Sequence, residues 1–142
     1  MLNEEQIWKL VDAKRAEFIA LSDRVFETPE TLYNEFASVA EHVAALKAEG
    51  FTVTEGICGM PTAVMGEAGT EGPVIAILGE FDALPQLSQA PGVAEHSPVE
   101  AGGYVHGCGH NLLGAASLLA ATAVKVWLAE NGIAARVRYY GC

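Results

Sequence analysis

The first half of the chain reads as two amphipathic helices. Apolar residues recur at three- and four-residue steps from about residue 4 to 27, with charged residues between them, namely Ile7, Leu10, Val11, Phe18, Leu21, Val25 and Phe26. Thr28-Pro29 ends this pattern, because proline disfavours helical conformation in the residue before it. A second helix is predicted over residues 34–48, with Gly50 in the position of a C-terminal capping glycine.

The pattern then changes to the period of strands. Residues 51–55 alternate apolar and polar side chains, and residues 62–67 form a second short candidate strand. Residues 74–78, Val-Ile-Ala-Ile-Leu, are apolar on both faces, which predicts a central strand covered on both sides. The stretch from Phe81 to Gly109 lacks periodicity and is rich in proline and glycine, so it predicts a long functional loop.

A third helix with small apolar side chains is predicted over residues 111–131, buried between layers, followed by a last strand over residues 136–140. This order predicts an α/β layered sandwich with a mixed sheet. The chain stops at the carboxyl end of a strand, where open α/β sheets place their sites, so we expect it to be cut from a longer protein. Trp8 and Trp127 are expected in the core, and His42 on the polar surface of the second helix.

Charge narrows the possible partners and location. The 142 residues contain 8 Lys and Arg against 18 Asp and Glu, a formal net charge of −10. This balance argues against nucleic acid and anionic membranes as partners, since both require basic patches. The acidic N-terminus has no signal-peptide pattern, and no apolar run reaches the length of a bilayer span, so we expect a cytoplasmic protein. Three widely spaced cysteines argue against a disulfide framework.

Two segments carry candidate chemistry. Glu80 and Asp82 directly follow the most apolar strand and lie two residues apart, so both carboxylates point to the same side if the strand continues. An acidic strand end with a turn into Leu84-Pro85 would explain the same residues without any function. No Lys or Arg occurs between Lys47 and Lys125, which fits a cation site better than a phosphate site.

The second segment is His106-Gly-Cys108-Gly-His110-Asn111, at the entrance to the third helix. Thiolate and imidazole are both transition-metal ligands, and the glycines allow the backbone to turn tightly around an ion. A metal site is therefore the main interpretation. A turn with a buried cysteine and a capping side chain is the structural alternative. Cys108 could also act as a nucleophile with His106 or His110 as its base.

Together, Gly-Glu-Phe-Asp-Ala-Leu-Pro and His-Gly-Cys-Gly-His-Asn resemble the metallo-amidohydrolases of the M20 peptidase family, in the branch of aminobenzoyl-glutamate hydrolase subunits and amino-acid-conjugate amidohydrolases. The segment Thr28-Pro-Glu-Thr-Leu-Tyr-Asn-Glu35 is similar to the same branch. The resemblance covers essentially the whole chain. It implies a phosphorylase/hydrolase-like catalytic domain, of which residues 1–142 would be the N-terminal portion, with the lid or dimerisation domain and the C-terminal portion absent.

The resemblance also implies roles. Cys108 and His110 would be metal ligands, and Asp82 would orient the metal site from behind a ligand. Glu80, His106 and Asn111 would lie near the site, and Asn111 departs from the aspartate that is more common there. The cofactor would be one or two divalent ions, zinc or manganese, with cobalt possible. The partners would be a small-molecule amide and further subunits, of the same or another kind.

The reaction implied is hydrolysis of an N-acyl amino acid or aminobenzoyl-glutamate-like amide by a metal-activated water. The family's general base and further ligands come from motifs that are not in this chain, so we expect residues 1–142 to be inactive alone. Two alternatives stay open. One is a thiol-dependent hydrolase that uses Cys108, and the other is a non-catalytic metal-binding or subunit-interaction module.

Overall fold

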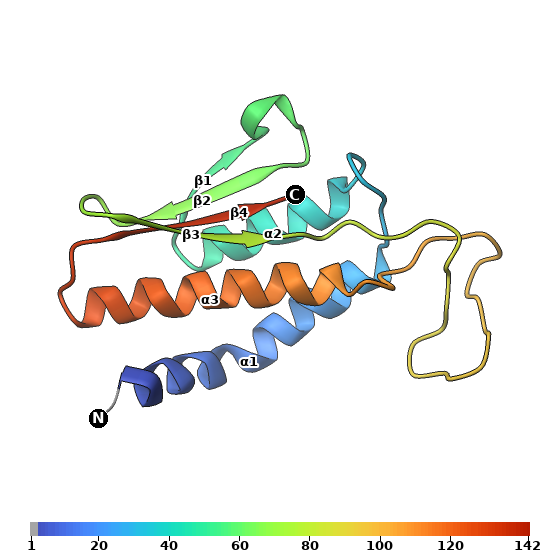
Figure 1. Ribbon diagram of the computed structural model, residues 1–142, viewed down its shortest axis with the longest axis horizontal. Helices are drawn as coiled ribbons and strands as arrows, with labels where there is room; N and C mark the ends of the chain where they lie inside the picture. Colours follow the sequence, from blue (N-terminus) through green and yellow to red (C-terminus); the bar gives the residue numbers. More distant parts are fainter. Residues whose placement is uncertain (1–2) are drawn as a thin grey trace.

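A four-stranded sheet carries all three helices on one of its sides in the computed structural model, which describes residues 3–142 (Figure 1). The helices are α1 (Asn3–Glu27), α2 (Phe36–Ala48) and α3 (His110–Glu130). The strands are β1 (Thr52–Glu55), β2 (Val64–Ala68), β3 (Val74–Gly79) and β4 (Arg136–Gly141), with a short 3-10 helix η1 (Ile57–Gly59) between β1 and β2. Every helix and strand predicted from periodicity is present, with bounds shifted by a few residues.

The sheet is mixed, as predicted. Its strand order is β1-β2-β4-β3, with β1/β2 and β2/β4 antiparallel and β3/β4 parallel. The parallel pair brings the carboxyl ends of β3 and β4 together, with Gly79 opposite Gly141 in register. The residues that follow β3 therefore emerge beside the end of β4.

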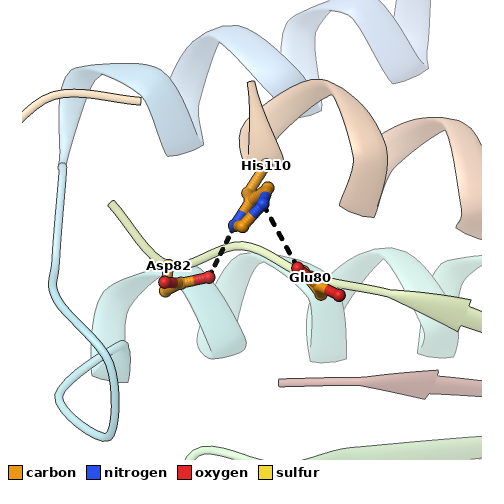
Figure 2. Close-up of side chains that lie close together, drawn as sticks. All are labelled: Glu80, Asp82 and His110. Atoms are coloured by element: carbon orange, nitrogen blue, oxygen red, sulfur yellow. Dashed lines mark hydrogen bonds and ion pairs between the residues drawn. The ribbon is translucent and has the colours of Figure 1, made fainter. Parts of the chain in front are cut away.

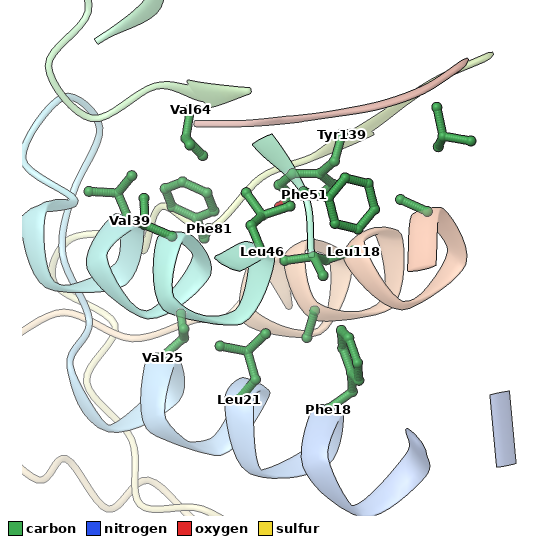
Figure 3. Close-up of a cluster of buried hydrophobic side chains, with 14 of the residues drawn as sticks. Phe18, Leu21, Val25, Val39, Leu46, Phe51, Val64, Phe81, Leu118 and Tyr139 are labelled. Carbon is green, nitrogen blue, oxygen red and sulfur yellow. The ribbon is translucent and has the colours of Figure 1, made fainter. Parts of the chain in front are cut away.

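The prediction that residues 74–78 form a central, covered strand is wrong for the described residues. β3 is an edge strand, and most of it is exposed, with Leu78 at 71%. An apolar sequence shows that a strand avoids water but does not show which strand lies beside it. Within residues 3–142, no helix covers the outer face of β3, because α1, α2 and α3 all lie on the opposite side (Figures 1 and 3).

The core lies between the sheet and the helices, and α3 occupies its middle layer. α3 packs on β3 and β4 on one side and on α1 on the other, as Figure 3 shows for Leu118 between Tyr139 and Leu21. Leu118, Ala121 and Tyr139 are fully buried. The prediction that this helix is buried between layers is correct for the face that carries Leu118 and Ala121, but Leu112 and Leu113 in its first turn are exposed.

α3 is long and apolar enough by length and composition to cross a membrane, contrary to the expectation that no segment reaches that length. Its Ala, Thr and Gly residues interrupt the strongly apolar positions, so no continuous run stands out in the sequence. The packing of α3 between α1 and the sheet is that of a core helix.

Trp8 and His42 do not have the predicted burial. Trp8 is 66% exposed, whereas Trp127 packs against the core as predicted. His42 is completely buried and stacks on Phe81, with ring centroids 4.4 Å apart. The buried stripe of α2 runs through Ser38, Val39, His42, Val43 and Leu46, so the helix is rotated relative to its most apolar face, and Phe36 is exposed.

Candidate metal centre

The side chains of Glu80, Asp82 and His110 converge at the carboxyl end of β3 (Figure 2). Glu80 and Asp82 lie on the segment that leaves β3, and His110 is the first residue of α3. One ligand atom from each of the three residues lies within 4.8 Å of the others. The prediction that Glu80 and Asp82 point to the same side is met by their common approach to His110.

The turn before α3 aims His110 at these carboxylates. Gly109 precedes the helix with φ of 85°, a left-handed conformation that glycine adopts without steric cost. One turn later, a Cβ on Gly114 would lie 2.8 Å from the backbone oxygen of Glu80 and 2.7 Å from His42 Nε2. Glycine at this position therefore allows the start of α3 to approach the Glu80 segment closely.

The hydrogen bond between His110 and Asp82 orients the imidazole. His110 Nδ1 lies 2.6 Å from Asp82 Oδ1, so its N–H donates to this carboxylate. A carboxylate on one ring nitrogen fixes the tautomer and leaves the other nitrogen as a lone-pair donor, the arrangement found behind metal-binding histidines. This hydrogen bond is compatible with the orienting role that the resemblance implies for Asp82, which remains a prediction.

The other ring nitrogen faces a second carboxylate. His110 Nε2 lies 3.2 Å from Glu80 Oε2. A lone pair and a carboxylate oxygen repel each other at this distance unless a proton or a cation lies between them. Imidazole nitrogen and carboxylate oxygen are both ligands for zinc, so this donor set fits a divalent cation. The Glu80 side chain is about half exposed, which leaves the centre open to solvent.

Cys108 lies outside this group. Its side chain is exposed, and its sulfur is not among the atoms that come within 4.8 Å of one another at Glu80, Asp82 and His110. The structure thus brings His110 together with the two carboxylates rather than with Cys108. The assignment of Cys108 as a metal ligand remains a prediction.

His106 holds the long loop against α1. Its side chain is buried, and its Nε2–H donates to the backbone oxygen of Val25 at 3.1 Å. Its ring also lies beside Phe26, with centroids 6.3 Å apart. Burial lowers the pKa of His106, which favours the neutral imidazole. In this structure His106 therefore anchors the segment that carries Cys108 and His110.

Asn111 faces α1 rather than the carboxylates. The side chain is buried, and its Nδ2 donates to the Ser22 Oγ at 3.0 Å and to the Ser22 backbone oxygen at 3.3 Å. Both partners accept hydrogen bonds here, so the NH₂ group of an amide fits this position. The carboxylate of an aspartate would instead face the Ser22 carbonyl oxygen with no hydrogen between the two oxygens. The asparagine ties the start of α3 to α1.

We expect the substitution Asn111→Asp to lower the free energy of unfolding at pH 7 by about 1–3 kcal/mol, the cost of leaving buried polar groups without good partners. Urea denaturation followed by circular dichroism would measure it. The loss should shrink at low pH, where a protonated aspartate can donate to Ser22. Equal stability of the two proteins at pH 7 would contradict this role for Asn111.

Cys142 lies next to the centre and was not singled out from the sequence. It continues the pairing of β4 with β3, since its N–H donates to Gly79 O at 3.3 Å and its carbonyl accepts from Phe81 N at 3.0 Å. This places Cys142 beside Glu80. Burial raises the pKa of the Cys142 thiol, and the negative charges of Glu80, Glu35 and Asp82 add to this shift.

Comparisons with known proteins agree with the motifs. The chain is 46% identical over 143 residues to a subunit of p-aminobenzoyl-glutamate hydrolase from Escherichia coli strain K12, covering 97% of this chain and 30% of that protein. It is 34% identical over 117 residues to thermostable carboxypeptidase 2 of Saccharolobus solfataricus, covering 76% of this chain and 29% of that protein. The chain thus spans less than a third of the length of these relatives. No protein-family model matches it.

Solved structures share the fold. The Bacillus subtilis YXEP protein, a dinuclear metal-binding peptidase of the M20 family, matches 92% of this chain and 35% of its own, with a TM-score of 0.72 and 24% identity. Human carnosine dipeptidase 1 matches 99% of this chain and 34% of its own, with a TM-score of 0.57 and 16% identity. The two motifs, the 46% identity to a hydrolase subunit over 97% of this chain, and the shared fold all make the chain similar to the M20 peptidases.

Proposed function

We propose that the protein carrying this chain is a metal-dependent amidohydrolase that cleaves an N-acyl amino acid or an aminobenzoyl-glutamate-like amide. One observation carries the proposal: Asp82 holds one nitrogen of His110 while the other nitrogen faces Glu80 at 3.2 Å. This is the donor arrangement of a divalent-metal site. The relative at 46% identity, which is a p-aminobenzoyl-glutamate hydrolase by name, supports the substrate class.

In this proposal the chain supplies the part of the active site that holds the cation. His110 Nε2 and a Glu80 oxygen would be ligands, and Cys108 would join them as the resemblance implies. Asp82 would keep the imidazole in the ligating tautomer and raise its basicity. A divalent ion in such a site polarises the scissile carbonyl and lowers the pKa of a bound water. The general base would come from outside residues 1–142.

The same proposal covers organisation and location. Residues 1–142 would be the N-terminal portion of the catalytic domain, with a lid domain and a C-terminal portion elsewhere in the protein. The relative from Escherichia coli is named as one subunit of its hydrolase, which supports assembly with further subunits. We place the enzyme in the cytoplasm, with zinc or manganese as the metal.

The thiol-dependent alternative gains no support from the geometry. A nucleophilic cysteine needs a base within hydrogen-bond reach. The free nitrogen of His110, Nε2, faces Glu80 Oε2 at 3.2 Å, and the buried ring of His106 is bonded to the Val25 backbone, whereas Cys108 is exposed. In the described part of the chain, no hydrogen bond joins Cys108 to either imidazole.

The test is hydrolysis of p-aminobenzoyl-glutamate and a panel of N-acyl amino acids by the full-length protein, before and after dialysis against a chelator. We expect activity to fall by at least 100-fold without metal and to return when Zn²⁺ or Mn²⁺ is added, because the cation activates the water. The 142-residue chain should show no turnover. Full activity in the chelated protein, or amidase activity in the 142-residue chain, would contradict the proposal.

A further inference from the structure

Glu35 is a buried carboxylate of which one oxygen has no partner in the described residues. It lies directly before α2 and is 2% exposed. Its Oε1 accepts a hydrogen bond from the Tyr33 backbone N–H at 2.9 Å. Its Oε2 is buried and has no hydrogen-bond partner among residues 3–142. Burying a carboxylate is costly unless it is paired, so an unpartnered oxygen at this position calls for an explanation.

The fold joins the segment that carries Glu35 to the loop that carries Asp82. Thr31 forms a parallel bridge with Ala83, in the loop after β3, and Ala83 N–H donates to Glu30 O at 2.6 Å. Asp82 is the neighbour of Ala83 in this loop. Cys142 adjoins the same loop, because its carbonyl accepts from Phe81 N–H at 3.0 Å, and the charges of Glu80, Glu35 and Asp82 add to burial in raising the pKa of its thiol. Glu35 therefore shares its surroundings with two members of the centre.

Within residues 3–142, no Lys or Arg forms an ion pair with Glu35, Glu80 or Asp82. The sequence has no Lys or Arg between Lys47 and Lys125. Lys14 pairs instead with Glu17 and Glu49, Arg24 with Glu41, Lys47 with Glu55, and Arg138 with Glu67. The side chain that pairs with Glu80 and Asp82 is His110. This region thus has an excess of negative charge that a cation would balance.

We propose that Glu35 is a positioning residue whose buried carboxylate strengthens the binding of a divalent cation at Glu80, Asp82 and His110. Its oxygens are not among the atoms within 4.8 Å of one another in that group, so it acts through the electric field and not as a ligand. Glu35 itself is buried, and a buried charge is screened less by water and salt than an exposed one. The inference rests on the proposed metal-dependent function.

The test compares the Zn²⁺ affinity of the wild-type 142-residue chain with that of Glu35→Gln, by competition with a chromophoric chelator. Glutamine keeps the acceptor for Tyr33 N–H and removes the charge. We expect the dissociation constant to rise by about tenfold, the lower end of the effect of groups behind metal ligands. Glu71→Gln, on an exposed turn, is the matched control for net charge and should leave the affinity unchanged.

A second measurement separates this role from a structural one. The metal-free Glu35→Gln chain should be at least as stable in urea as the wild type, because an unpaired buried carboxylate is gone. Failure of this variant to fold, or an unchanged Zn²⁺ affinity in a folded variant, would overturn the inference while leaving the proposed function intact. If the wild-type chain and the full-length protein both bind no divalent ion, the proposed function fails, and this inference fails with it.

Discussion

Acidification from pH 7 to pH 4 is expected to remove about 3 kcal/mol of folding stability through His42. Burial lowers the pKa of this imidazole from 6.5 to about 4, and the hydrogen bond between its Nδ1 and the Ser38 backbone oxygen at 2.9 Å opposes the shift only in part. The ring is stacked on Phe81 in the interior, where a positive charge is poorly solvated.

The direction follows from proton uptake. Between pH 6.5 and pH 4, His42 binds a proton in the unfolded chain and stays neutral in the folded chain. The stabilising contribution is therefore complete above pH 6.5 and is lost progressively as the pH falls to about 4. Each unit of pKa difference corresponds to about 1.4 kcal/mol, which gives the total of about 3 kcal/mol.

Urea denaturation at a series of pH values between 4 and 7.5 would measure this effect, with His42→Gln as the test variant. The variant should be less stable at pH 7.5, because it loses the stacked ring, and its stability should depend less steeply on pH between 6.5 and 4. His96→Gln is the matched control, since His96 is exposed in the long loop. Parallel pH profiles for wild type and His42→Gln would contradict the buried neutral state.

The substitution Asp82→Asn is expected to weaken divalent-metal binding by about 10- to 100-fold. Asparagine has the shape of aspartate and can still accept from His110 Nδ1. It carries no charge, however, so it does not raise the basicity of the imidazole. Its amide can also rotate and present its NH₂ group to His110 Nδ1, which favours the tautomer with the proton on Nε2. The 2.6 Å contact between Asp82 and His110 is the interaction that changes.

Competition titration with Zn²⁺ would give both dissociation constants. Asp12→Asn, an exposed aspartate on α1, is the control for the change in net charge. Circular dichroism should show that the Asp82→Asn chain is folded, because Asp82 is only partly buried. An affinity equal to that of wild type in the folded variant would show that Asp82 does not orient a metal ligand.

The positions of helices and strands could be predicted from the sequence more accurately than the way these elements pack against one another. Periodicity located three helices and four strands, because it reports which face of each element avoids water. It could not place β3 at the edge of the sheet, since an apolar strand has the same sequence whether or not another strand lies beside it. The prediction that His42 lies on the surface was wrong, because a polar residue in a helix is usually solvated. The burial of His42 depends instead on packing against Phe81, which is distant in the sequence.

In the candidate site, too, residues within one short segment were easier to predict than contacts between distant segments. Glu80, Asp82 and His110 could be singled out because they lie in two short segments with recognisable spacing, whereas the role of Cys108 from the same segments remains a prediction. Their partners were harder to predict. Cys142 reaches the site only through the parallel register of β3 with β4, and Glu35 through the bridge between Thr31 and Ala83. Pairing between distant segments leaves no local pattern in the sequence.

The most direct test of the metal centre is X-ray anomalous scattering at the zinc absorption edge from crystals of the chain grown with Zn²⁺. We expect a peak bonded to His110 Nε2 and to a Glu80 oxygen, at about 2.0–2.2 Å from each. Asp82 should still bond His110 Nδ1 from behind. Well-ordered crystals with no zinc at His110, or with zinc bound only at other residues, would contradict the assignment of Glu80, Asp82 and His110 as a metal centre.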